Sequence, residues 1–122
     1  IVTDHAPHAA EEKADFLKAP NGVVGLETSL AVTLTQLYHT GKLTLGRIAE
    51  LMAINPRKLL GIEVTRIEKG AKADLAVVDL DKEWTVVPEK LHSKSKNTVF
   101  KGEKLKGKNI MTITNGEIRF EG

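Results

Sequence analysis

The sequence IVTDHAPH, residues 1–8, places a carboxylate and two imidazoles directly after an apolar pair. Its first three residues are β-branched, which favours a short strand that ends at Asp4. Such a motif suits a metal-dependent hydrolase, because the carboxylate can ligate a cation and exchange a proton with bound water, while a nearby His can hold an anionic substrate. A strand–loop–helix order would put Asp4 at the face where barrel enzymes build their active sites. The spacing leaves open whether Asp4 and His8 bind one metal or face a substrate from opposite sides.

A long loop is expected over residues 4–24. Within it, EEKAD at 11–15 can form one helical turn, and APNG at 19–22 is a strong turn signal. A loop of this length inside a compact domain is usually functional or disordered.

Three helical segments should follow the loop, because apolar residues then recur at helical spacing. The first should end near Thr40-Gly41, and the second should begin at the capping residue Thr44. The second should end at Asn55-Pro56, since a residue before proline is disfavoured in the α region. A short third helix over 56–60 should then close at Gly61.

The second half of the sequence is rich in β-strand signals, with a boundary near residues 62–66. The expected strands cover residues 73–79, 83–87, 98–100, 111–114 and 117–120. Asn115-Gly116 lies between the last two and is a strong hairpin signal. We therefore expect an α/β protein with two units, residues 1–62 and residues 63–122.

Composition excludes several classes of protein. The net charge of +2 comes from basic and acidic residues mixed along the chain, which argues against a nucleic-acid surface. The basic run from Lys101 to Lys108 is expected to be a solvated loop. There is no cysteine, which fits a cytoplasmic protein, and no apolar run approaches the length of a membrane span.

The sequence starts at Ile1 without an initiator methionine, and nothing before Asp4 could supply other metal ligands. We therefore expect a C-terminal piece of a larger enzyme, with part of an active site.

Several motifs resemble the bacterial dihydroorotase family of the amidohydrolase superfamily. Residues 3–8, 11–13 and 19–28 resemble the last barrel strand of these enzymes and the loop after it. NPRKLLG at 55–61 and KGAKADLAVVD at 69–79 resemble the superfamily's barrel exit and its return to a small β-sandwich. SKSKNTVFKG at 93–102 resembles the dihydroorotase tail, with Val99 where proline is expected. The resemblance implies the C-terminal part of a TIM barrel followed by a β-sandwich segment.

The resemblance also implies a role for individual residues. Asp4 matches an aspartate that is both a zinc ligand and the general base and acid. His8 matches the residue that binds the α-carboxylate of the substrate. Asn21 and Gly22 match a pair in the substrate loop that contributes mainly backbone contacts.

The implied reaction is the reversible cyclisation of N-carbamoyl-L-aspartate to L-dihydroorotate in pyrimidine synthesis. The complete site would hold two zinc ions, with most of their ligands outside these residues, so this chain alone should be inactive. A homodimer is expected, and an aspartate transcarbamoylase is the partner that the resemblance suggests. Neither a nucleic acid nor a membrane is expected as a partner.

Two alternatives to a dihydroorotase stay open. One is a hydantoinase or allantoinase of the same superfamily, which need not clamp a carboxylate at His8. The other is a subunit without activity that scaffolds a transcarbamoylase. Structural roles are expected for the remaining histidines, His5, His39 and His92, and for the core candidates Tyr38 and Trp84. Glu27 could cap or orient the loop.

Overall fold

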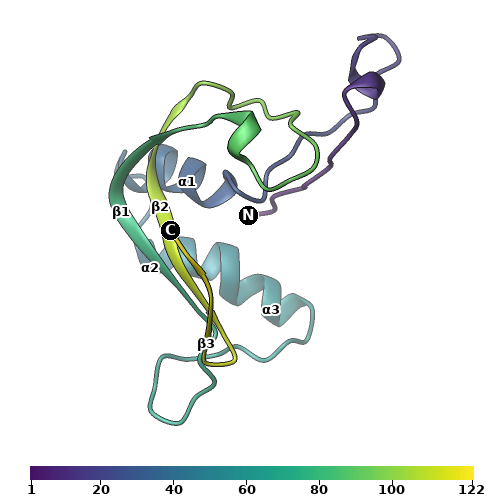
Figure 1. Ribbon diagram of the computed structural model, residues 1–122. Helices are drawn as coiled ribbons and strands as arrows, with labels where there is room; N and C mark the ends of the chain where they lie inside the picture. The colour runs from purple at the N-terminus through teal and green to yellow at the C-terminus, as the bar shows by residue number, and fades with distance from the viewer.

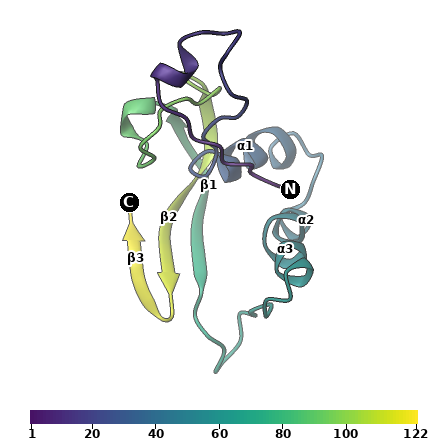
Figure 2. The ribbon, with the colours of Figure 1, turned by 90° about the vertical axis from the view of Figure 1, so that its right-hand side faces the viewer.

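The computed structural model describes residues 1–122, and its helices lie on one side of a small sheet (Figures 1 and 2). The helices are α1 (Ser29–Thr33), α2 (Leu45–Ala49) and α3 (Asn55–Leu59), and the strands are β1 (Leu75–Thr85), β2 (Lys104–Thr114) and β3 (Glu117–Glu121). Short helical turns are η1 (Glu11–Lys13), η2 (Leu34–Tyr38), η3 (Glu50–Ile54) and η4 (Pro88–Lys90). No helix combines the length and apolar composition that crossing a membrane requires.

The predicted ends of the first helix and the start of the second are confirmed. Helix α1 continues through the wider π turn η2 and stops before Gly41, whose φ is +72°. Helix α2 begins at Thr44, whose side-chain hydroxyl accepts a hydrogen bond from the Arg47 N–H at 3.2 Å. This bond satisfies one of the free N–H groups at the helix start.

The predicted break at Asn55-Pro56 is wrong. Asn55 keeps helical angles, with φ −64° and ψ −42°, and the chain runs from α2 through η3 into α3. The reason lies in η3, where the Asn55 N–H bonds to the Glu50 carbonyl five residues back. A proline ring normally collides with the carbonyl of the preceding turn, and a wider π turn relieves that collision. The predicted stop at Gly61 is confirmed by its φ of +67°.

The three strands form one antiparallel sheet in the order β1-β2-β3. The predicted hairpin between β2 and β3 is confirmed, with positive φ at both Asn115 and Gly116. The strands predicted over 73–79 and 83–87 prove to be parts of the single strand β1. The register shifts between Asp79 and Glu83, where the Asp79 side chain accepts two backbone N–H bonds and bends the strand without ending it.

Two other predictions for the C-terminal half are wrong. Residues 98–100 include a turn and no strand, and the basic run is not a loop, because β2 begins at Lys104. Burial alternates along this run, because Leu105 and Gly107 are buried and the lysines between and beside them are not. Lys106 bonds to Asp81 across the sheet at 3.0 Å, so opposite charges and a buried face replace the expected solvation.

The small core joins the helices to the sheet. Ala31 of α1 packs with Val86 and Leu105, and the partly buried Trp84 lies against them as expected. Helix and strand approach closely at Gly107, where φ is +98° and an added Cβ would lie 2.5 Å from the Leu34 Cδ1. Glycine is therefore required at this crossing.

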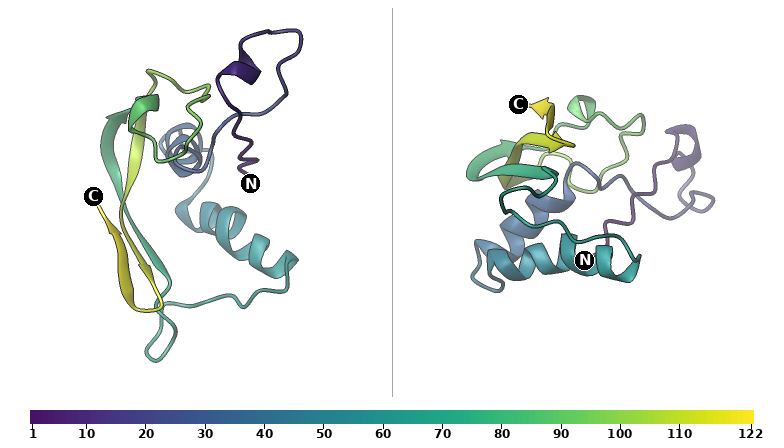
Figure 3. Two further views of the ribbon diagram at one scale, coloured as in Figure 1. Left: turned by 45° about the vertical axis from the view of Figure 1, so that its right-hand side comes forward. Right: turned by 90° about the horizontal axis from the view of Figure 1, so that it is seen from below.

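Within this chain the expected strand over residues 1–3 does not form, and neither a barrel nor a second sheet is present. The first residues run as extended chain beside the helices (Figure 3). Their single strand-like contact is a parallel bridge between His5 and Val23. Only 11 of 122 residues are buried, so much apolar surface lacks cover in this chain.

Candidate active site

Asp4 has an unusual backbone conformation. Its φ is +48°, and the other non-glycine residue with a positive φ, Asn115, sits in the hairpin turn. Asp4 lies in no such turn. Aspartate tolerates this region better than most residues, at a cost of about 1 kcal/mol. Strain of this kind often marks functional sites, so it supports the interpretation of Asp4 as an active-site residue.

Both neighbours of Asp4 are tied to the start of the first helix. Thr3 donates a hydrogen bond from its hydroxyl to that of Ser29 at 3.0 Å. His5 accepts a hydrogen bond at Nδ1 from the Gly25 N–H at 3.1 Å, which is the structural role expected for this imidazole. The Asp4 carboxylate itself is exposed and makes no hydrogen bond within the chain. The backbone is therefore fixed around a carboxylate that is left available.

His8 and the predicted substrate loop come together. The His8 Nε2 lies 3.0 Å from the Asn21 carbonyl oxygen, and its Nδ1 lies 3.5 Å from a Glu12 carboxylate oxygen. Because a carbonyl only accepts hydrogen bonds, Nε2 carries the proton in this arrangement. The same N–H could serve a carboxylate that took the place of the Asn21 carbonyl.

Gly22 is fixed by hydrogen bonds to its carbonyl group, and its position leaves no room for a side chain. Its carbonyl accepts hydrogen bonds from the Lys13 ammonium at 2.8 Å and from the Asn97 amide at 3.1 Å. Its φ is +114°, and an added Cβ would overlap the Ala6 Cβ. This position therefore requires glycine, in keeping with the backbone role expected for it.

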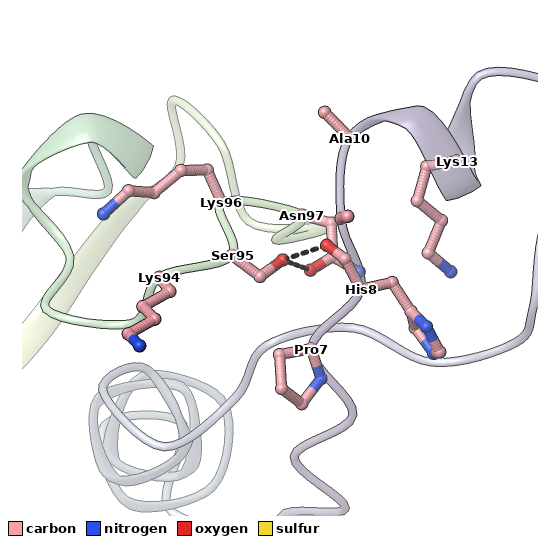
Figure 4. Close-up of a pocket in the computed structure, with 9 residues that line it drawn as sticks. Pro7, His8, Ala10, Lys13, Lys94, Ser95, Lys96 and Asn97 are labelled. Carbon is pink, nitrogen blue, oxygen red and sulfur yellow. Dashed lines mark hydrogen bonds between the residues drawn. The ribbon is translucent and has the colours of Figure 1, made fainter.

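A cavity of about 620 Å³ lies beside His8 (Figure 4). Its walls come from residues 7–10 with Lys13, and from residues 94–97 of the C-terminal half. The second wall is the part of the site that no sequence motif indicated, because the residue types of SKSKN are not diagnostic of any chemistry. Of the predicted site residues only His8 lines the cavity. The hydrogen bond to the Asn21 carbonyl brings Asn21-Gly22 next to His8, whereas Asp4 makes no such contact.

The side chains of this chain do not fit a zinc site by themselves. No three His, Cys, Asp or Glu side chains gather closely enough to hold a metal ion. Structural and catalytic zinc sites use about three or four protein ligands, and Asp4 could supply one.

Glu27 orients the loop that follows η4, and not the loop of residues 4–24 for which this role was expected. Its carboxylate accepts hydrogen bonds from the backbone N–H groups of His92 and Ser93, at 2.9 and 3.0 Å, and lies 2.9 Å from the His92 ring. Partial burial acts to raise the pKa of Glu27, but these hydrogen bonds outweigh it and hold the pKa below its ordinary value. The His39 Nε2, by contrast, lies 2.8 Å from the Leu80 carbonyl oxygen, and its ring packs edge-on against Tyr38, which fits the structural role expected for it.

Comparison with known proteins identifies the family. The profile of the Amidohydrolase family matches residues 1–119. The chain belongs to this family. Among curated relatives, dihydroorotases of Clostridioides difficile and Acetivibrio thermocellus are 50% and 47% identical to it over 119 residues, 97% of this chain. The chain spans about 28% of the length of each of these relatives.

Solved structures of the family have the same fold over this stretch. An L-hydantoinase from Arthrobacter aurescens superimposes with a TM-score of 0.88 at 36% identity, covering 97% of this chain and 28% of its own. A dihydropyrimidinase from Brevibacillus agri matches with a TM-score of 0.84 at 22% identity, covering 97% of this chain and 27% of its own. The second likeness is one of fold alone. The chain is thus an α/β piece of the amidohydrolase fold.

Proposed function

We propose that this chain supplies part of the active site of a dihydroorotase, the enzyme that interconverts N-carbamoyl-L-aspartate and L-dihydroorotate. The observation that carries the proposal is the identity of 50% over 97% of the chain with a relative of that name, which exceeds the 36% found for an L-hydantoinase. The strained, hydrogen-bond-free Asp4 and the loop around His8 support it independently.

Each predicted residue then has a chemical task. On cyclisation the carbamoyl nitrogen attacks the side-chain carboxyl carbon, so that a C–N bond forms and a C–O bond breaks to release water. The Asp4 carboxylate accepts the proton that this nitrogen loses, and returns one to it when water reopens the ring. The His8 Nε2–H binds the α-carboxylate of the substrate, replacing its present hydrogen bond to the Asn21 carbonyl. Asn21 and Gly22 contact the substrate through their backbone. The hydrogen bonds to the Gly22 carbonyl hold that backbone in place.

The remainder of the site would lie in polypeptide beyond these residues. We propose that Asp4 is one ligand of a two-zinc site and that the other ligands come from barrel strands this chain lacks. Residues 1–62 would then complete a TIM barrel and residues 63–122 a β-sandwich, which agrees with the apolar surface left uncovered here. Assembly as a homodimer in the cytoplasm, with an aspartate transcarbamoylase as a further partner, belongs to the same proposal.

A hydantoinase-type cyclic amidohydrolase is the second candidate. The TM-score of 0.88 with an L-hydantoinase supports it, and that likeness extends over 97% of the chain. The two candidates differ in the substrate carboxylate, which dihydroorotate has and hydantoin lacks. His8 would have this task only in a dihydroorotase.

A substrate comparison tests the proposal. The enzyme assayed is the complete enzyme, meaning this chain joined to the barrel segments it lacks, which the Clostridioides difficile relative can provide. We expect hydrolysis of L-dihydroorotate and little hydrolysis of hydantoin, and replacement of His8 by Ala should raise the KM for dihydroorotate. Preference for hydantoin, with no effect of His8→Ala, would favour the second candidate.

A further inference from the structure

The two segments proposed to bind substrate are held by a third segment, from the other half of the chain. Ser95 donates a hydrogen bond from its hydroxyl to the His8 carbonyl at 2.6 Å. Asn97 donates from its side-chain amide to the Gly22 carbonyl at 3.1 Å, and its own carbonyl accepts the Val24 N–H at 3.2 Å. These contacts span 87 and 75 positions of sequence, so they join parts that no local rule brings together.

The two side chains also contact each other. The Ser95 hydroxyl lies within hydrogen-bonding distance of the Asn97 side-chain oxygen as well as of the His8 carbonyl (Figure 4). That contact leaves the Asn97 amide nitrogen facing the Gly22 carbonyl. The imidazole of His8 points away from Ser95, so its ring nitrogens are left for other partners.

The segment that carries these residues is itself anchored. The Lys96 ammonium donates to the carbonyls of Leu91 and Ser93, at 2.5 and 2.8 Å, and closes the loop on itself. The Glu27 carboxylate holds the start of the same loop through the N–H groups of His92 and Ser93. A loop fixed at both of these points can act as a rigid support for its neighbours.

We propose that Ser95 and Asn97 form a clasp that positions His8 and the Asn21-Gly22 loop for binding the substrate carboxylate. The clasp consists of these two side chains, and the proposal rests on the proposed dihydroorotase function. It acts on substrate binding and leaves the proton transfer alone, because the neighbours of Asp4 are held separately by Ser29 and Gly25. Loss of the clasp therefore changes KM much more than kcat.

The test uses four variants of the complete enzyme, assayed with L-dihydroorotate. Ser95→Ala removes one hydroxyl, and Asn97→Asp replaces the donor that faces the Gly22 carbonyl by a carboxylate. Each should raise KM about fivefold to tenfold, the effect of one lost hydrogen bond, with kcat within about twofold of the parent. Ser95→Thr keeps the hydroxyl and should restore the KM of the parent. Lys101→Ala is the control, since this exposed lysine of the same half of the chain lies outside the cavity and its side chain makes no hydrogen bond or ion pair.

Each outcome is decisive. If the parent enzyme fails to hydrolyse dihydroorotate, the proposed function falls and the clasp with it. If the parent is active and neither variant changes KM, the clasp alone is refuted. A fall in kcat and melting temperature without a change in KM would show a purely structural role and also refute it. Should Asn97→Asp fail to fold, Ser95→Ala, which loses a single oxygen, decides the question.

Discussion

The N-terminal segment, residues 1–28, and the β1–β2 pair are built differently. The first is held mainly by polar contacts, such as those of His5 and Lys13, and leaves Phe16 and Leu17 more than 90% exposed. The second buries Leu105, together with Val86 directly after β1, against α1, and it carries none of the predicted site residues. The contrast indicates that chemistry and stability lie in separate parts of this chain. Changes to one part should therefore leave the other largely intact.

The largest effect is expected at Asp4. Asp4→Asn in the complete enzyme should lower kcat by about 10²–10⁴, the usual contribution of a general acid or base. Stability should hardly change, because the side chain is exposed and asparagine also tolerates a positive φ. Steady-state kinetics and a melting curve measure the two quantities. Asp15→Asn, an exposed carboxylate in the same loop, is the control and should leave kcat unchanged.

A loss of stability, and not of activity, is expected for a substitution in the sheet. Leu105→Ala should lower the free energy of unfolding by about 2–5 kcal/mol, because it leaves a cavity in the small core. Urea unfolding of this chain, followed by the fluorescence of its one tryptophan, Trp84, measures the loss. Val99→Ala is the control, since Val99 is 65% exposed and should cost little. Equal losses from the two substitutions would mean that the Leu105 core does not stabilise the chain.

A smaller loss of stability is expected where helix and sheet cross. Gly107→Ala places a methyl group against Leu34 at a φ of +98° and should cost about 1–3 kcal/mol. The same urea experiment applies, with Gly102→Ala as control. Gly102 also has a positive φ, of +81°, but no atom lies within 4 Å of the added Cβ, so the difference isolates the steric part.

The smallest effect concerns the loop that supports the site. The pKa of Glu27 lies below its ordinary value of 4.5, so the folded state takes up this proton at a lower pH than the unfolded state does. The stabilisation is complete above about pH 4.5 and is lost as the pH falls through the lowered pKa. The protection factors of the His92 and Ser93 amides, which compare their exchange rates with those of an unfolded peptide at the same pH, should fall over this window. In the Glu27→Gln variant these protection factors should not change with pH, and a fall of equal size in it would contradict the assignment.

Local signals predicted local structure well. Asn115-Gly116 fixed the hairpin, and Thr44, Gly41 and Gly61 fixed helix ends, because each acts on its own backbone. The wrong predictions have two kinds of cause. At Asn55-Pro56 and at Asp79 a local feature, a π turn and a side-chain turn, lets the helix or the strand continue where a break was expected. At Lys106 a distant contact decides the structure, because its partner Asp81 lies on the neighbouring strand.

The candidate site shows the same division. The composition of residues 1–8 indicated a hydrolase, and the resemblance supplied roles for Asp4 and His8. Ser95 and Asn97 could not be found this way, since their partners lie 87 and 75 positions away and neither residue type is diagnostic. The positive φ of Asp4 was equally invisible, because aspartate adopts ordinary angles in most settings.

One measurement tests the central claim, that this chain carries an essential carboxylate but an incomplete site. Zinc content and dihydroorotate hydrolysis should be measured on this chain alone and on the complete enzyme, each with Asp4 and with Asn at position 4. We expect zinc and turnover only in the complete enzyme, and turnover only when Asp4 is present. Stoichiometric zinc with turnover in this chain alone, or full activity of the complete enzyme without Asp4, would contradict the account.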